Sequence, residues 1–73
     1  MYHDLLLTCG ETLHGPRWQS DLARDLDIDD RTMRRWVAGT SPIPDGVSVD
    51  LMRLLLKRAS AIDGLIETLK SNG

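Results

Sequence analysis

Cysteine is almost absent from this 73-residue sequence, and the single Cys9 has no partner for a disulfide within the chain. A lone cysteine suits a reducing compartment. Long hydrophobic runs are missing as well, since no stretch approaches the ~20 apolar residues that span a membrane. The N-terminus lacks the basic start and small-residue cleavage site of a secretory signal. We therefore expect a cytoplasmic protein.

Aromatic residues and positive charge are also in short supply. The chain has two tryptophans, one tyrosine and no phenylalanine, and its 9 Lys and Arg residues are outnumbered by 11 Asp and Glu residues, which gives a net charge of −2. No overall positive field therefore attracts a nucleic acid. The 41% of hydrophobic and 27% of charged residues are nevertheless typical of a soluble globular domain.

The short length restricts the size of the core. Seventy-three residues are about half of a typical domain, and such a chain buries only about 60% of the surface that it exposes when unfolded. This length excludes a multidomain enzyme and a large internal catalytic cleft.

Glycines and prolines divide the chain into four segments in which apolar residues recur with helical spacing. The predicted helices are His3–Leu13, Pro16–Leu26, Asp30–Ala38 and Val47–Lys70. No segment shows the alternation of a strand, so we predict an all-α fold, a small helix-turn-helix bundle of about four helices. We expect a single domain, in which residues 1–46 form the helix-turn-helix core and residues 47–73 form a C-terminal helix that completes it.

Particular residues mark the ends of these helices. Gly15 and Gly39 are expected to end helices as C-cap residues, and Asp27 can take the left-handed conformation of a tight turn. Asp29 is a good N-cap for the helix that follows it. The first helix is expected to bury one apolar stripe, formed by Leu5, Leu6, Cys9 and Leu13.

The third predicted helix has two chemically different faces. At 100° per residue, an arc of roughly 100° holds Arg31, Arg34, Arg35 and Ala38, and an arc of similar width on nearly the opposite side holds Met33, Trp36 and Val37. The apolar arc is expected to pack against the domain, which leaves a ridge of three arginines exposed. Arginine pairs bidentately with guanine edges and with phosphates. Because the second helix of a helix-turn-helix enters the major groove, this ridge predicts DNA binding.

A simpler interpretation is that these arginines are ordinary solvated side chains, paired with Asp27 or Asp30. The preceding helix, the tight turn and the glycine stop together favour the DNA-binding interpretation. Arg31 and Arg35, four residues apart, are the best candidates for base contacts, and Arg34 can reach a base or the DNA backbone.

The segment from Trp18 to Gly39 resembles the helix-turn-helix of the lambda-repressor-like (Cro/repressor) family. In that family a glutamine opens the first motif helix, Leu-Ala lies inside it, and an apolar residue follows a small residue in the turn. A capping serine or threonine then starts the recognition helix, which ends in an aromatic residue or leucine followed by glycine. The matching residues are Gln19, Leu22, Ala23, Ile28, Thr32, Trp36 and Gly39. The close resemblance covers about a third of the chain.

The resemblance implies a transcriptional regulator, and a repressor in particular, that binds double-stranded DNA at a palindromic operator. It also implies that Gln19 touches a phosphate and braces the recognition helix, whose N-terminal residues face the groove. The predicted DNA-binding residues are therefore Gln19, Asp30, Arg31, Thr32, Arg34 and Arg35.

Two residues depart from the family pattern. Asp27 replaces the usual glycine of the turn, and Asp29 replaces the usual capping serine or threonine, although both are conformationally acceptable. Asp29 and Asp30 also set two negative charges where DNA approaches. Asp30 can accept a hydrogen bond from cytosine, but it also repels a phosphate.

Other chemistry has little support in the sequence. His3, His14 and Cys9 are the only soft metal ligands, and structural zinc sites need four ligands at characteristic spacings that are absent here. No third group supports a Cys–His nucleophile, and no glycine-rich phosphate loop is present. We expect no metal, cofactor, small-molecule ligand or enzymatic activity. We also expect Cys9 to be a buried inert thiol, and both tryptophans to lie in the core rather than to stack on bases.

The last predicted helix carries an apolar seam with heptad spacing. The seam residues are Met52, Leu55, Ala59, Ile62, Ile66 and Leu69. A second apolar stripe, formed by Val47, Leu51 and Leu54, covers only the first half of the helix. We therefore expect the start of the helix to pack on the core and the seam to form a homodimer interface. The alternative is a helix that breaks between Ser60 and Gly64 and folds back onto its own core.

The sequence also fits a second class of function, a small antitoxin-like or adaptor protein that acts by binding another polypeptide. Such a protein would use its apolar helix faces rather than the arginine ridge, so its binding would respond far less to salt than phosphate contacts do.

Overall fold

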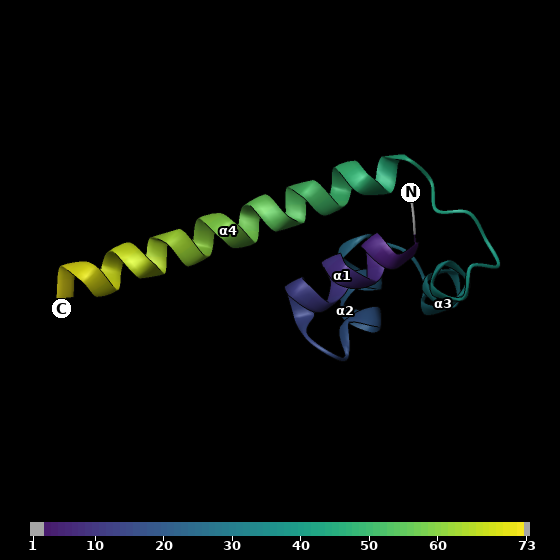
Figure 1. The fold of residues 1–73 in the computed structure, drawn as a ribbon, viewed down its shortest axis with the longest axis horizontal. Helices are drawn as coiled ribbons and strands as arrows, with labels where there is room; N and C mark the ends of the chain where they lie inside the picture. Colours follow the sequence, from purple (N-terminus) through teal and green to yellow (C-terminus); the bar gives the residue numbers. More distant parts are fainter. Residues whose placement is uncertain (1–2, 73) are drawn as a thin grey trace.

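The computed structural model describes residues 3–72 and consists, over that range, of four helices without strands. The helices are α1 (His3–His14), α2 (Trp18–Asp25), α3 (Asp30–Ala38) and α4 (Gly46–Asn72), which follow one another along the chain (Figure 1). The predicted all-α fold with a long C-terminal helix is confirmed, and the boundaries agree to within two residues. Residues 1, 2 and 73, at the outer ends of the expected segments 1–46 and 47–73, lie outside the described residues.

The glycine and aspartate positions that were expected to end helices have left-handed backbone conformations. Gly15, Gly39 and Asp27 have φ values of 81°, 77° and 57°. Gly39 is the C-cap of α3, and its N–H donates to the Trp36 carbonyl at 3.2 Å. The main difference from prediction is the start of α2. Pro16 and Arg17 form a turn instead of the first helical turn, and Arg17 has non-helical φ and ψ of −106° and 49°.

The core lies where α1, α2 and α3 meet, and the start of α4 covers it. The buried apolar residues are Leu6, Leu13, Trp18, Leu22, Ala23, Met33, Trp36, Ile43, Val47 and Leu51. Trp18 and Trp36 are 4% and 6% exposed, so the prediction that both tryptophans are core residues is confirmed. The buried stripe of α1 differs from prediction, because it includes Gly10 while Leu5 is 52% exposed.

Gly10 is buried because the indole ring of Trp18 covers it. A Cβ atom added at Gly10 would overlap the ring atoms of Trp18, so that the ring or the helix would have to shift to accommodate it. The contact brings α1 and α2 together with nothing larger than a hydrogen atom between the helix backbone and the ring. It therefore sets the spacing of the first two helices.

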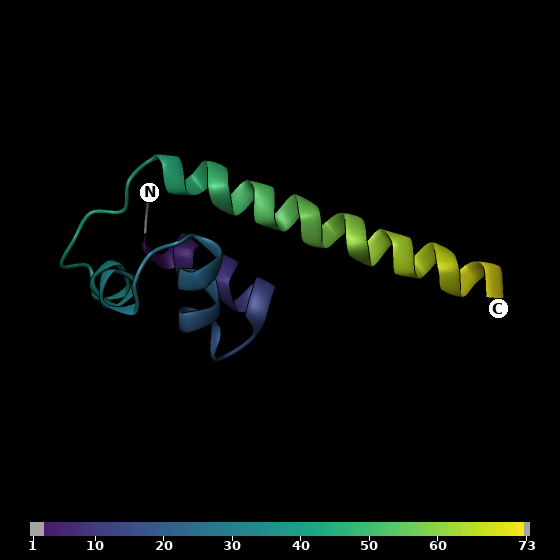
Figure 2. The same cartoon turned by 180° about the vertical axis from the view of Figure 1, so that it is seen from behind.

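The first turns of α4 pack against α1, and the rest of the helix leaves the domain. Val47 and Leu51 are buried, Leu54 and Leu55 are half-buried, and every described residue from 56 to 72 is exposed. We call residues 56–72 the arm. The helix is continuous through 60–64, so it does not fold back onto its own core. Figures 1 and 2 show the arm extending beyond the three-helix domain.

The overall dimensions agree with a projecting arm. The molecule measures 49 × 22 × 20 Å and its radius of gyration is 14.4 Å, whereas a compact domain of this length has about 11 Å. Within the described range, none of the helices combines the length and the hydrophobicity that crossing a membrane requires.

Gly10→Ala is expected to destabilise the protein by about 1–3 kcal/mol, the usual cost of forcing an extra methyl group into a packed core. The matched control is Gly64→Ala, because Gly64 also lies inside a helix but has no neighbouring atom within 4 Å of an added Cβ. The control should increase helicity, since alanine is about 1 kcal/mol better than glycine in a helix. Thermal unfolding followed by circular dichroism measures both, and equal midpoints for the two variants would contradict the role given to Gly10.

Candidate nucleic-acid interface

The connection between α2 and α3 is a tight turn held by backbone hydrogen bonds. The Leu26 N–H donates to the Leu22 carbonyl at 2.9 Å, and the Ile28 N–H donates to the Ala23 carbonyl at 3.0 Å. Between them, Asp27 takes the left-handed conformation that reverses the chain. The half-buried Ile28 side chain packs against the core. This arrangement fixes α3 relative to α2 and is the geometry of a helix-turn-helix.

Asp29 is the N-cap of α3, as its sequence position predicted. Its Oδ1 accepts a hydrogen bond from the Thr32 N–H at 2.7 Å, and its backbone is extended with φ −81° and ψ 161°. These hydrogen bonds from Thr32 lower the pKa of the Asp29 carboxyl below its ordinary value, and the positive charges of Arg31 and Arg35 lower it further. The carboxylate thus compensates free amides at the start of the helix.

The outer face of α3 is a ridge of charged side chains. Met33 and Trp36 are buried on the inner side of the helix. The exposed residues of α3 are Asp30, Arg31, Arg34, Arg35 and Ala38. Helical periodicity alone separates the two sets, so the three arginines point away from the domain. We call Arg31, Arg34 and Arg35 the arginine ridge.

The arginine ridge is not neutralised by ion pairs. Among the described residues, no carboxylate oxygen lies within 4.0 Å of a side-chain nitrogen of Arg31, Arg34 or Arg35. The ion pairs with Asp27 or Asp30 that the simpler interpretation of the arginines predicted are therefore not formed. Two other exposed arginines do form ion pairs, Arg24 with Asp21 at 3.4 Å and Arg53 with Asp50 at 3.9 Å. The ridge leaves its guanidinium groups available for a ligand with negative charge.

The remaining predicted contact residues differ in exposure. Gln19 is exposed near the start of α2 and Asp30 is exposed at the start of α3. Thr32 is half-buried, and its N–H is used by the Asp29 cap. The side chain of Gln19 makes no hydrogen bond to the described part of α3, so the bracing contact expected from the family resemblance is not formed in the free chain.

Sequence reasoning missed a hollow beside the N-terminal end of α3. The hollow has a volume of about 440 Å³ and is lined by Ser20, Arg24, Asp27, Ile28, Asp29 and Asp30. Its three carboxylates oppose an approaching phosphate, while the arginine ridge attracts one. The surface is thus electrostatically divided, with carboxylates around the hollow at the start of α3 and the arginine ridge along its outer face.

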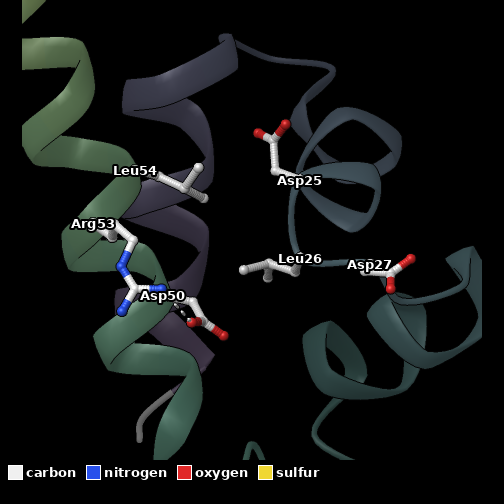
Figure 3. Close-up of a pocket in the computed structure, with 6 residues that line it drawn as sticks. All are labelled: Asp25, Leu26, Asp27, Asp50, Arg53 and Leu54. Atoms are coloured by element: carbon white, nitrogen blue, oxygen red, sulfur yellow. Dashed lines mark ion pairs between the residues drawn. The ribbon is translucent and has the colours of Figure 1, made fainter.

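A second opening lies between the end of α2 and the start of α4. Figure 3 shows Leu26 and Leu54 pointing toward one another across this cleft of about 250 Å³. Asp25, Asp27 and Asp50 surround the apolar pair, and Asp50 forms an ion pair with Arg53 at 3.9 Å. The cleft is open to solvent, and the residues that line it are two leucines, three aspartates and one arginine.

The histidines and the cysteine that could bind a metal lie in different surroundings. His14 Nε2 is 2.6 Å from Asp25 Oδ2, a contact that joins the C-terminal ends of α1 and α2. Cys9 is half-buried, and burial raises the pKa of its thiol, which keeps it protonated and less reactive. Within residues 3–72, no three His, Cys, Asp or Glu side chains form a group that could hold a metal ion.

Comparison with protein-family models, with curated proteins and with solved structures finds no match in any of the three. The geometry of the interface is therefore the basis for a functional proposal.

Asp29→Ala is expected to lower the thermal midpoint because it removes the acceptor for the Thr32 N–H, whereas Asp29→Ser keeps an acceptor and most of the stability. Asp30→Ala is the matched control, since Asp30 is an exposed neighbour that does not serve as the N-cap. Thermal unfolding measures the order of the three variants. A midpoint for Asp29→Ala equal to that of Asp30→Ala would refute the capping role.

The same carboxylate makes stability depend on pH. The pKa of Asp29 is lower in the folded chain than its ordinary value of 3.8, so its contribution is present above that pH and is lost as the pH falls through the lowered pKa. Asp29→Ser should therefore lose less stability than the wild type on acidification.

Proposed function

We propose that this protein is a sequence-specific DNA-binding transcriptional regulator, in particular a repressor, which inserts α3 into the major groove of double-stranded DNA. The observation that carries the proposal is the unpaired arginine ridge on the outer face of the second helix of a helix-turn-helix. Arginine forks on such a helix match guanine edges and phosphates. The resemblance of residues 18–39 to the lambda-repressor-like family points in the same direction.

The proposed roles follow from position along α3. Arg31 and Arg35 read bases, Arg34 contacts a base or the backbone, and Gln19 contacts a phosphate. Asp30 and Thr32 face the edge of the groove. We propose no catalytic step and no cofactor for this surface, and we place the protein in the cytoplasm.

Homodimerisation is part of the proposal because the arm exposes apolar residues. Ile62, Ile66 and Leu69 of the seam are 49%, 43% and 70% exposed. A second copy would cover them and would present two α3 helices to the two halves of a palindromic operator. Two copies also double the phosphate contacts, which compensates for the net charge of −2 of one chain.

The exposed arm also supports a second candidate, an antitoxin-like or adaptor protein that binds a different polypeptide through the seam. The two functions differ in the surface that carries binding. DNA binding needs the arginine ridge and weakens as the salt concentration rises. An apolar protein interface depends much less on the salt concentration and on substitutions in the arginine ridge.

A binding site selected from random double-stranded DNA provides the probe for the proposed function. Affinity for that site should fall steeply with salt concentration because phosphate contacts release counterions. Arg35→Ala should weaken binding by about 1–3 kcal/mol and relax the base preference at one position of each half-site. Arg53→Ala is the control, because Arg53 is an exposed arginine outside the interface that pairs with Asp50. The assignment fails if fluorescence anisotropy gives the same affinity for both variants.

The dimer is tested by a double variant, Ile62→Asp with Ile66→Asp. Both side chains are exposed and outside the core, so the domain should remain folded while the dissociation constant of the dimer rises at least a hundredfold, given about 1.5–3 kcal/mol for burial of each isoleucine. Ser60→Asp with Thr68→Asp adds the same charge to the outer face of the arm and should leave the dimer intact. Sedimentation velocity measures both, and an unaltered dimer in the first variant would exclude the seam as its interface.

A further inference from the structure

The apolar surface of α4 is wider than the heptad seam. Val49 and Leu56, which are not seam residues, are 56% and 65% exposed. Leu5 on α1 is also exposed, although it lies beside the seam. Together with the exposed seam residues Met52, Ile62, Ile66 and Leu69, they extend the apolar surface along most of α4, and a contiguous apolar surface of this kind is typical of an interaction site. Pairing through the seam alone would leave the side chains of Val49, Leu56 and Leu5 exposed to water.

A groove runs between α1 and α4 at the base of the arm. It has a volume of about 250 Å³ and an almost wholly apolar lining, formed by Leu5, Cys9, Ser48, Leu51, Met52 and Leu55. Met52 and Leu55 belong to the seam as well, so groove and seam form one continuous surface. A helix that pairs with the seam therefore lies over the mouth of the groove.

Helical geometry places Val49 and Leu56 on the flank opposite the groove. At 100° per residue, they lie roughly 70–90° to one side of the line through Met52 and Leu55, and Leu51 lies at a similar angle on the other side. The buried contact of α4 with α1 is on the Leu51 side. Near the base of the arm, one flank of the helix thus carries projecting apolar side chains and the other carries the groove that could receive them. Further along the arm, Leu65 projects from the groove flank and is 64% exposed.

The geometry points to a parallel, two-fold pairing of two copies of this chain, in which Leu56 of each copy occupies the α1–α4 groove of the other. In a parallel pair of helices in register, each position on the groove flank faces the position five residues later on the opposite flank of the partner, so Leu51 faces the partner's Leu56. The projecting side chains therefore meet the groove twice, once on each side of the symmetry axis. This arrangement rests on the homodimer of the proposed function and specifies its direction and contacts.

The charges on the arm agree with the parallel direction. Arg58 lies on the groove flank and Asp63 on the opposite flank, five residues further along. Among the described residues, neither forms an ion pair within its own chain. A spacing of five residues between opposite flanks is that of the interhelical g and e positions of a parallel coiled coil. Arg58 therefore faces the partner's Asp63, and Asp63 faces the partner's Arg58.

An antiparallel pair centred on the seam fits less well. It places Val49 near the partner's Lys70 and Leu56 near the partner's Asp63, so the apolar flank meets charged side chains. It also separates the two α3 helices. Figures 1 and 2 show α3 at the end of the molecule opposite the C-terminal end of the arm. Only a parallel pair keeps both arginine ridges at one end of the dimer, where a single DNA duplex can contact both.

Cysteine cross-linking tests the direction of pairing in a Cys9→Ala background. In the parallel dimer, Met52→Cys and Leu69→Cys each lie opposite their own copy and should form disulfide-linked dimers under mild oxidation. In the antiparallel dimer, the two copies of either residue are roughly 25 Å apart along the axis, too far for a disulfide, which requires Cα atoms within about 7 Å. Thr68→Cys on the outer face of the arm is the control and should not cross-link.

Leu56→Asp tests the occupied groove, because Leu56 lies outside the seam. Sedimentation equilibrium should show at least a tenfold rise in the dissociation constant of the dimer, and Ser60→Asp, which adds the same charge to the outer face, should show little change. In the wild type, alkylation of Cys9 by N-ethylmaleimide should slow as protein concentration rises, because Leu56 of the partner subunit covers the groove. Both readouts use side chains outside the arginine ridge.

The outcomes separate this inference from the function on which it rests. The two cysteine variants can also be mixed. If a disulfide forms only between a Met52→Cys chain and a Leu69→Cys chain, the dimer is antiparallel, which overturns the inference but leaves homodimerisation intact. A dimer unaffected by Leu56→Asp would overturn the groove contact alone. A wild-type chain that stays monomeric at all concentrations would overturn the homodimer itself, and the effect of Arg35→Ala on DNA binding would still report on the arginine ridge.

Discussion

The contact between Trp18 and Gly10 is the constraint on which the arrangement of the domain depends. The indole ring lies directly on the backbone of α1, so the position of α2 is fixed by a contact that only glycine permits. The turn after α2 is short and closed by backbone hydrogen bonds, so it fixes α3 relative to α2. The position of α3 relative to α1 therefore also depends on the contact between Trp18 and Gly10. In a chain with so small a core, one large aromatic residue seated on one glycine sets the distance between the first two helices.

Features that depend on local chemistry could be predicted from the sequence. Asp29 and Asp27 have conformational preferences that hold in any protein, so the cap and the turn were correct, and helical periodicity was sufficient to separate the arginine ridge from Met33 and Trp36. Features that depend on contacts between distant segments could not be predicted. Gly10 looks like a weak position in a helix until the ring of Trp18 is placed over it. The exposure of Leu5 and the groove beside it become visible only when the course of α4 along α1 is known.

The positions of the charged side chains around α3 matter more for binding DNA than the net charge of the chain. The net charge is −2, yet three arginines without ion pairs occupy one side of α3, and three aspartates surround the adjoining hollow. A phosphate backbone would be attracted along one part of this surface and repelled at another. Such a surface restricts the orientations in which DNA could bind and weakens attraction to arbitrary sequences, so discrimination would depend on specific contacts of the arginine side chains.

The unbroken α4 also affects how the chain behaves at different concentrations. Residues 56–72 are all exposed, and most of the stability of a helix in a protein comes from tertiary packing of its apolar face. The helicity of the arm is therefore weakly supported in a single chain and strongly supported in a pair. With the pairing proposed above, ordering of the arm and association are one equilibrium, so the entropy of ordering the arm reduces the affinity of the dimer. Under the proposed function, occupancy of a DNA site would then respond to protein abundance more steeply than binding of a monomer allows, so that the length of α4 would by itself set a concentration threshold.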